Sequence, residues 1–149
     1  MSKEFNKNKV VVITGGAKKI GRATAKKLAN QGFNILIHTG GKSIEEAKKT
    51  VEIVKAYGVK SNFVDGDLVD LTTINKIKEA AEKLGTPSVL INNAALRIHE
   101  DFEKITYEDW KKVMAINVDA SFLCTQALIG YMTKQKWGRV INIGGISGH

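Results

Sequence analysis

The stretch VVVITGGAKKIGR, residues 10–22, decides the fold of this chain. Its first four residues are apolar and mostly β-branched, which predicts a buried strand. The glycines that follow let the chain turn tightly, and the apolar spacing of Ile20, Ala23 and Leu28 predicts a helix over 20–31. A strand, a glycine-rich turn and a helix in this order are typical of a phosphate-binding loop, because the free amides and positive dipole end of the helix attract a pyrophosphate.

The same alternation of apolar runs and amphipathic segments continues to the end of the chain. Further strands are predicted at 34–38, 59–64, 88–91 and 140–143, and further helices at 43–57, 71–84 and 106–134. Ser43 with Glu46, and Thr106 with Asp109, are the residue pairs expected to cap two of these helices. Strands that are apolar throughout predict a parallel sheet covered on both faces. We therefore expect one domain over 1–149, a doubly wound α/β (Rossmann) sheet with strand order 3-2-1-4-5.

Composition argues against several other classes of protein. The net charge is +8, but most lysines stand beside glutamates in helical segments and only three arginines are present, so nucleic acid is not the expected partner. Cys124 lies in an apolar helical run and is expected to be a buried hydrophobe, and the histidines lack metal-ligand spacing, so no metal is expected. We expect a cytoplasmic protein, because residues 1–9 are polar and no apolar run reaches the roughly 18 residues of a membrane span.

The residues after the second strand indicate which dinucleotide would bind. An acid at this place binds the ribose 2′-hydroxyl of NAD, whereas residues 38–43 read HTGGKS and contain none. Lys42 and Ser43 stand at the start of the next helix, and Lys18 lies in the glycine-rich turn, so a 2′-phosphate has three polar partners available. These features favour NADP(H). The alternative is that Lys42 and Ser43 only cap the helix.

Together these turns resemble the short-chain dehydrogenase/reductase family, across essentially the whole chain. The family pattern Thr-Gly-x-x-x-Gly-x-Gly is similar to Thr14, Gly15 and Gly21, and its Asn-Asn-Ala-Gly turn is similar to residues 92–95. The middle glycine is replaced by Lys19, a basic residue at a position where the pteridine-reductase branch also carries one. This departure puts a standard loop geometry in doubt.

The resemblance implies a set of cofactor contacts, in which Asp67 and Leu68 lie by the adenine and Asn93 touches the ribose. Such residues also favour turns for local reasons, which is the alternative explanation. The residues expected to bind the cofactor are Gly15, Gly16, Ala17, Lys18, Lys19, Ile20, Gly21, Thr39, Lys42, Ser43, Asp67, Leu68, Asn93 and Ala94.

The resemblance also implies a catalytic group that this chain matches only in part. Asn117 matches the asparagine that opens the helix and holds a relay water, or it is a satisfied core amide. The family serine falls at Gly145 by register, so Ser147 either replaces it or is a bystander. The Tyr-x-x-x-Lys pair is expected after His149, so the 149 residues alone are expected to be inactive and to stop short of a whole family domain.

The expected function is NADPH-dependent reduction of a small-molecule carbonyl substrate, either a 3-oxoacyl thioester or a pteridine. One alternative is a non-catalytic NADP(H)-binding sensor or scaffold that has lost its serine, and another is a protein that binds anions or nucleic acid through its lysines. Family members usually pair through the helix at 106–134. A homodimer or homotetramer is therefore expected, with Val113, Phe122, Ala127 and Leu128 available for contact.

Overall fold

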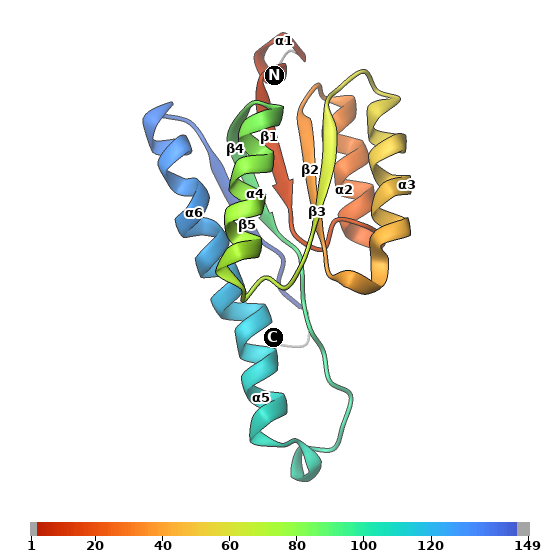
Figure 1. Ribbon diagram of the computed structural model, residues 1–149, viewed down its shortest axis with the longest axis vertical. Coiled ribbons are helices and arrows are strands. Elements are labelled where there is room, and N and C mark those ends of the chain that lie inside the picture. Colours follow the sequence, from red (N-terminus) through yellow and green to blue (C-terminus); the bar gives the residue numbers. More distant parts are fainter. Residues whose placement is uncertain (1–2, 146–149) are drawn as a thin grey trace.

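The computed structural model describes residues 3–145, which form a five-stranded parallel sheet flanked by helices (Figure 1). The strands are β1 (Lys9–Ile13), β2 (Asn34–Thr39), β3 (Ser61–Asp65), β4 (Thr86–Asn92) and β5 (Arg139–Asn142). Their order is β3-β2-β1-β4-β5, and every neighbouring pair is parallel. The predicted fold class and strand order are confirmed.

The helices occupy the connections between strands, as the sequence predicts. They are α1 (Lys3–Asn6), α2 (Lys19–Asn30), α3 (Ile44–Lys55), α4 (Leu71–Leu84), α5 (Tyr107–Met114) and α6 (Ala120–Lys134), with short 3₁₀ turns η1 (Gly41–Ser43) and η2 (Phe102–Lys104) and a π-helical segment η3 (Ala115–Asp119). The α5, η3 and α6 segments form one continuous helix. It extends past the carboxyl end of the sheet together with the segment that precedes it (Figure 1).

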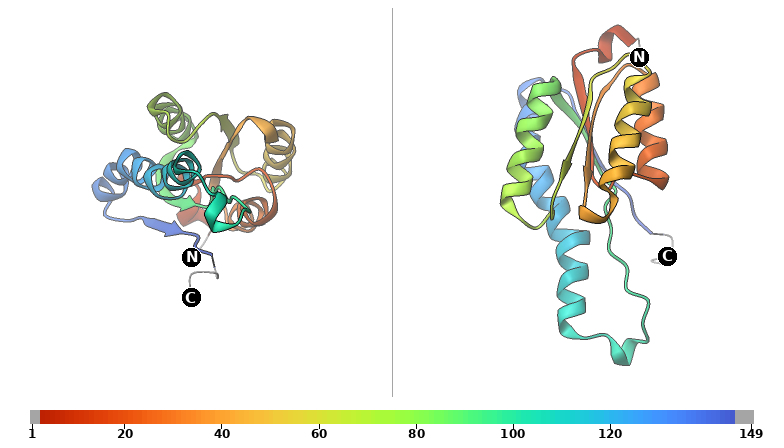
Figure 2. Two further views of the ribbon diagram at one scale, coloured as in Figure 1. Left: turned by 90° about the horizontal axis from the view of Figure 1, so that it is seen from below. Right: turned by 45° about the vertical axis from the view of Figure 1, so that its right-hand side comes forward.

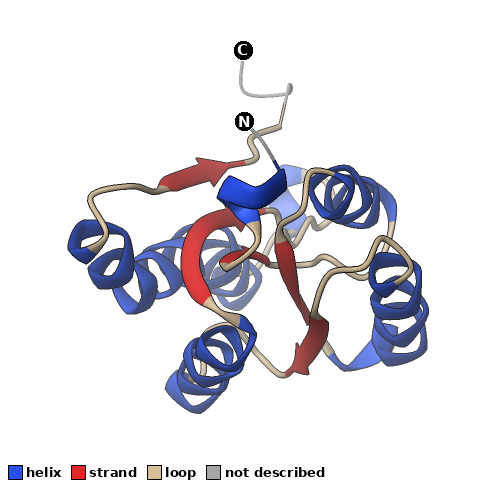
Figure 3. Cartoon of the chain, turned by 90° about the horizontal axis from the view of Figure 1, so that it is seen from above, coloured by secondary structure: helices blue, strands red, loops and turns tan. Residues whose placement is uncertain are grey.

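Two hydrophobic clusters, one on each face of the sheet, hold the layers together. Helices α2 and α3 cover one face and α4 and α6 cover the other (Figure 2), and Figure 3 shows helices on both sides of the strands. Alternate residues of β1 point to opposite faces, so Val11 packs with the α2 and α3 side while Val12 packs with the α4 and α6 side. Burial on both faces explains why β1, β2 and β4 read as continuous apolar runs.

The helix predicted over 20–31 is confirmed as α2, and its buried residues are small. Gly21, Ala25 and Ala29 are buried and Leu28 packs partly against the core, whereas Ile20 is 61% exposed and Ala23 is also exposed. The three buried residues are spaced four apart and carry little or no side chain, so α2 can lie close to the sheet. Ile20 instead lines the cavity described below.

The two expected capping pairs have different outcomes. Thr106 and Asp109 form a complete capping box at the start of α5, as predicted. Ser43 is the N-cap residue of α3, but within residues 3–145 its side chain makes no capping hydrogen bond. The Glu46 carboxylate is engaged elsewhere, because it accepts a 2.5 Å hydrogen bond from Arg22. The predicted Ser43–Glu46 box is therefore wrong.

The long helix packs on the sheet and is itself rich in apolar residues. Tyr107–Lys134 is long and apolar enough to cross a membrane by length and composition, a test that core helices of globular domains also pass. Asn117 and Asp119 interrupt it, so it contains no continuous apolar run of about 18 residues, as expected. Cys124 and Leu128 are buried against the sheet, as predicted for the cysteine, so Leu128 is not available for contact with a second subunit.

Candidate cofactor site

A cavity of about 1200 Å³ opens at the carboxyl ends of β1, β2, β3 and β4. This is the edge of a parallel sheet at which ligands bind, where the strand order reverses between β1 and β4. Thirteen of the fourteen residues expected to bind the cofactor line it: Gly15, Ala17, Lys18, Lys19, Ile20, Gly21, Thr39, Lys42, Ser43, Asp67, Leu68, Asn93 and Ala94. Gly16 does not, because it is buried beneath the loop and donates its amide to the His38 carbonyl at 3.0 Å.

Close packing explains two of the glycines in the loop. Gly15 has a φ of +61°, and a β-carbon there would lie 3.0 Å from Ala94 Cα. A β-carbon on Gly21 would lie only 2.6 Å from the Gly15 carbonyl oxygen and 2.7 Å from Gly16 Cα. Gly21 therefore allows α2 to pack closely against the glycine-rich loop, whose atoms are nearer to this glycine than those of the sheet. The first turn of α2 comes within reach of the cavity as a result.

Lys19 keeps the backbone conformation of the glycine that it replaces. Its φ is +50°, in the left-handed region that costs a residue with a β-carbon about 1–2 kcal/mol. The loop thus has the path that a glycine would allow, with a lysine side chain added at the rim of the cavity. The positive φ of Lys19 is the conformation that the glycine of the family pattern would favour.

Asn93 and Thr14 fasten the inner side of the loop to the end of β4. The Asn93 side-chain amide donates to the carbonyl oxygens of Thr14 and Gly15, each at 3.0 Å. In return, the Thr14 hydroxyl accepts from the backbone amides of Asn93 and Ala94, also at 3.0 Å each. Four hydrogen bonds therefore join the two turns that flank the centre of the cavity.

Arg22 and Thr50 hold the outer side of the loop, a role that sequence analysis missed. Arg22 donates to the Ala17 carbonyl at 2.8 Å, to the Thr50 hydroxyl at 2.6 Å and to the Glu46 carboxylate at 2.5 Å. Thr50, which is fully buried on α3, also donates to Ala17 at 2.8 Å. The hydrogen bond from Arg22 lowers the pKa of Glu46 below its usual range. The only sequence signal was that Arg22 is one of three arginines in a lysine-rich chain.

His38 is a second residue that sequence analysis did not select. Its side chain lies at the floor of the cavity and the residue is 3% exposed. The ring contacts the backbone of Gly15 on one side and of Gly66 on the other. Burial lowers the pKa of His38, against the opposing effects of the Gly66 hydrogen bond and of Asp65 and Asp67.

Charges of both signs line the cavity. Lys18, Lys19 and Lys42 supply the positive charges along the glycine-rich loop and η1, while Asp65 and Asp67 follow β3. Within the described part of the chain, one oxygen of Asp65 is buried without a hydrogen-bond partner. An unpaired buried acceptor is costly, so this oxygen suits a hydroxyl or amino donor of a ligand. The lysines suit a ligand that also carries phosphates.

Asn117 lies in the π-helical segment and reaches across to the chain that follows β4. Its side-chain oxygen accepts from the Leu96 amide at 2.8 Å, and its nitrogen donates to the Leu96 carbonyl at 3.0 Å. The residue is exposed, so the alternative of a core amide is wrong, although the amide is fully paired. Leu96 and Ile116 both line the cavity, so Asn117 shapes its wall.

The other residue expected to be catalytic, Ser147, lies outside the described residues, whereas Gly145 is described and exposed. Over residues 3–145, the cavity lining includes no tyrosine, and neither Arg97 nor His99. Tyr131 packs between α6 and α4, where burial and a hydrogen bond to Glu82 raise its pKa to about 12. In the same part of the chain, no group of three His, Cys, Asp or Glu side chains could hold a metal ion.

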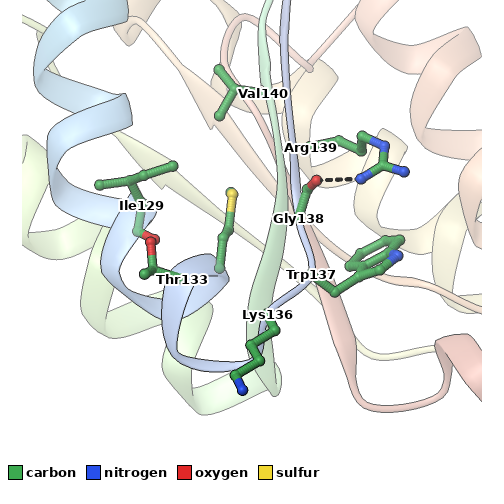
Figure 4. A pocket seen from close by; sticks show the side chains of 8 residues that line it. Ile129, Thr133, Lys136, Trp137, Gly138, Arg139 and Val140 are labelled. Carbon is green, nitrogen blue, oxygen red and sulfur yellow. Dashed lines mark hydrogen bonds between the residues drawn. The ribbon is translucent and has the colours of Figure 1, made fainter.

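A smaller cavity of about 370 Å³ lies between the end of α6 and the start of β5 (Figure 4). Trp137, Arg139 and Val140 line it, and the Arg139 guanidinium donates to the Gly138 carbonyl at 2.7 Å. Trp137 also packs edge-on against Phe5 of α1, with ring centres 5.8 Å apart. This cavity is at the amino ends of the strands, opposite the edge where a parallel sheet binds ligands.

Comparisons with known proteins agree with this geometry. A 3-oxoacyl-[acyl-carrier-protein] reductase of Aquifex aeolicus is 37% identical over 142 residues, and an L-rhamnose 1-dehydrogenase (NADP(+)) of Thermoplasma acidophilum is 38% identical over 145. The alignments cover 94% and 96% of this chain but only 56% and 57% of the relatives. A crystal structure of a 3-oxoacyl (acyl-carrier-protein) reductase from Agrobacterium tumefaciens with NADP bound superimposes with a TM-score of 0.83 and 27% identity, over 95% of this chain and 54% of that one.

The chain thus spans a little more than half the length of these relatives. Residues 9–149 match the protein family described as short chain dehydrogenase, from the first strand to the last residue of the sequence. This single continuous match includes all five strands, the glycine-rich loop and the turn after β4. The chain belongs to the short chain dehydrogenase family.

Proposed function

We propose that this chain is the cofactor-binding part of an NADPH-dependent oxidoreductase that reduces a carbonyl group. The single observation that carries the proposal is the cavity at the carboxyl ends of the strands, with three lysines at its rim and Thr39 in place of an acid at the end of β2. A cofactor with a 2′-phosphate gains charge-assisted hydrogen bonds there, whereas NADH does not. A related structure with NADP bound, and a relative whose name specifies NADP(+), support the choice.

The residues present fit such a cofactor on grounds of their chemistry. The free amides at the start of α2, together with Lys18 and Lys19, suit the pyrophosphate, and Lys42 and Ser43 suit the 2′-phosphate. The unpaired Asp65 oxygen suits a hydroxyl or amino donor of the adenosine part. When bound, the cofactor supplies the hydride, and this chain orients it. Asn117 would steady the wall beside the reacting end through Leu96.

We propose a 3-oxoacyl thioester as the substrate class, because one of the relatives reported above carries that activity in its name. Other relatives are named for a sugar or a small diol, so both serve as competing substrates in the test. Reduction also needs a proton donor, and within residues 3–145 no tyrosine lines the cavity. The alternative function is an NADP(H)-binding sensor, favoured by Gly145 in the register position of the serine.

We also propose that the complete protein forms a homodimer or homotetramer through the outer face of α5 and α6. Trp110, Val118, Phe122 and Ile129 are between 43% and 61% exposed on this helix. An apolar surface of this kind is typical of a protein interface. In a light-scattering experiment, Phe122→Arg should shift the complete protein toward a monomer, while Lys134→Glu on the same helix should not.

The function is tested by titrating the complete protein with NADPH and NADH and then following NADPH oxidation with acetoacetyl-coenzyme A, L-rhamnonolactone or acetoin. We expect at least a tenfold preference for NADPH, about 1.4 kcal/mol, and turnover of the thioester. Binding of NADPH without oxidation of any substrate would favour the sensor. Equal affinity for the two cofactors would refute the proposed role of the lysines.

A further inference from the structure

The His38 ring joins two loops that are far apart in sequence. The Gly15 amide lies 3.5 Å from its Nδ1, and its Nε2 lies 2.9 Å from the Gly66 carbonyl oxygen. An amide N–H can only donate and a carbonyl oxygen can only accept. Nδ1 must therefore be the acceptor and Nε2 must carry the proton. Only the neutral ring with its proton on Nε2 satisfies both neighbours.

Backbone hydrogen bonds bring the same two loops to β2. The His38 carbonyl accepts from the Gly16 amide at 3.0 Å, and the Thr39 carbonyl accepts from the Gly66 amide at 3.1 Å. The glycine-rich loop and the turn after β3 thus meet at the last two residues of β2. The His38 ring adds the only one of these links that can change with pH, because peptide groups do not titrate.

A second proton on His38 would turn Nδ1 from an acceptor into a donor. Nδ1 would then face the Gly15 amide, also a donor, and the contact between them would be lost. The ring is 3% exposed, so water cannot easily replace the missing partner. Gly15 is also held from the other side by Asn93, so release of the first contact loosens the loop without unfolding it.

The charged groups around the ring act in opposite directions. Asp65 and Asp67, at the end of β3, favour the protonated ring, as does the Gly66 carbonyl, while burial opposes it more strongly and lowers the pKa of His38. The remaining charged side chains that line the cavity are Lys18, Lys19 and Lys42, which carry the same sign as a protonated ring. His38 is therefore neutral at pH 7, and acid conditions are needed to protonate it.

We propose that His38 is a positioning residue for the cofactor-binding loop. Its neutral ring links the Gly15 amide to the Gly66 carbonyl, and a second proton on the ring releases the loop and weakens cofactor binding. This inference rests on the proposed function, in that NADP(H) is the ligand whose affinity responds. It adds to that function a pH-sensitive element within the wall of the cavity.

The test compares His38→Asn with His38→Gln in the complete protein. The Asn side chain can place an acceptor near Nδ1 and keep the bond to Gly15, whereas the Gln amide reaches the Nε2 position and keeps only the bond to Gly66. Calorimetric titration with NADP⁺ at about pH 7.5 should give near-native affinity for His38→Asn and about tenfold weaker binding for His38→Gln. Equal affinity of all three proteins would overturn the proposal.

The pH profile separates this role from a purely structural one. As the pH falls below about 6.5, the ordinary pKa of histidine, the dissociation constant of the native protein should rise more steeply than that of His38→Asn. The 2′-phosphate of NADP⁺ titrates near pH 6 in every sample, so only the difference between the two profiles counts. Parallel profiles would overturn the proposal.

Two measurements on the protein without cofactor keep the inference separate from the proposed function. Nitrogen NMR of the native His38 ring should show a single tautomer with its proton on Nε2 at neutral pH, and the opposite tautomer would refute the geometry. At one pH, the Gly15 amide should exchange faster in His38→Gln than in the native protein, and in the native protein its protection relative to the intrinsic exchange rate should fall at low pH. If the native protein binds no NADP⁺, the proposed function fails, while these two results still decide the role of His38 in the loop.

Discussion

The side-chain amide of Asn93 lies 3.0 Å from the carbonyl oxygen of Gly15 and donates a hydrogen bond to it. The two residues are 78 positions apart in the chain, and their contact joins the turn after β4 to the glycine-rich loop after β1. Both turns line the large cavity. The shape of the site therefore depends on a contact between central strands, as well as on the local sequence of the loop.

Replacing Asn93 with alanine should lower the free energy of unfolding by about 2 kcal/mol, because it leaves the Thr14 and Gly15 carbonyls without their donor. Chemical denaturation measures this difference. The matched control is Asn75→Ala, an exposed position on α4, which should change stability by less than about 0.5 kcal/mol. Equal stability of the two variants would mean that water replaces the Asn93 amide at no cost.

Replacing Lys19 with glycine should leave the free energy of unfolding unchanged or raise it by up to about 1 kcal/mol. The φ of +50° strains any residue with a β-carbon, and relief of that strain offsets the greater freedom of glycine in the unfolded chain. The control is Ala23→Gly, at an exposed position inside α2, which should cost about 1 kcal/mol. Thermal unfolding measures both changes. Equal destabilisation of the two variants would contradict the conclusion that the positive φ strains Lys19.

Structure could be predicted best from the sequence where it depends on residues that are neighbours in the chain. The strands are continuous apolar runs, and Gly15 and Gly21 stand at fixed places after the first of them, so the fold followed from local sequence. Lining residues such as Asp67 and Asn93 were expected only from the family resemblance. The Thr106–Asp109 box was also local and is confirmed. The φ of Lys19 could be expected only from the glycine that related sequences carry there.

Residues whose partners are distant in sequence could not be predicted. Arg22 binds Glu46 and Thr50 across the gap between α2 and α3, and this diverts Glu46 from the cap of its own helix. The His38 ring contacts Gly15, which follows β1, and Gly66, which follows β3. The exposure of Ile20 has a related cause, because Gly21, the next residue, packs closely against the glycine-rich loop. In each case tertiary contacts outweighed a local preference.

Replacing Thr39 with aspartate should reverse the cofactor preference. Thr39 is buried at the end of β2 and lines the cavity, where a carboxylate would repel a 2′-phosphate and could accept from a ribose hydroxyl. We expect NADPH affinity to fall at least tenfold and NADH affinity to fall less or rise. Thr39→Asn has the same shape without the charge. A loss of NADPH binding in Thr39→Asn as large as that in Thr39→Asp would attribute the effect to packing.

The single cysteine should be inert in the folded protein. Cys124 is 1% exposed, and burial raises the pKa of its thiol to about 11, so at about pH 8 only ~0.1% of it is thiolate. A maleimide or a disulfide reagent should label the native protein very slowly and the denatured protein at once. The labelling rate should rise with pH as the thiolate fraction rises. Rapid labelling at neutral pH would mean that α6 opens readily from the sheet.

Replacing Asn117 with alanine should free the segment between β4 and α5 without unfolding the domain. The Asn117 amide pairs with both backbone groups of Leu96, and this pairing is the specific contact between the π-helical turn and the cavity wall. Because the site is exposed, the loss of stability should be small, about 1 kcal/mol. Hydrogen exchange at the Leu96 amide should nevertheless accelerate strongly, since within residues 3–145 the Asn117 oxygen accepts the hydrogen bond of this amide.

Asn117→Asp provides the sharper comparison, because a carboxylate keeps the acceptor for the Leu96 amide but loses the donor to its carbonyl. Exchange at Leu96 should then stay slow while NADPH affinity changes little. This result would show that the hydrogen bond to the Leu96 amide, and not the amide group of Asn117 as such, holds the wall of the cavity. Gln126→Ala, on the exposed side of the same helix, controls for changes in helix stability. If the Leu96 amide stays protected even in Asn117→Ala, then packing of Ile116 holds the wall. The hydrogen bonds of Asn117 would then not explain why η3 is π-helical.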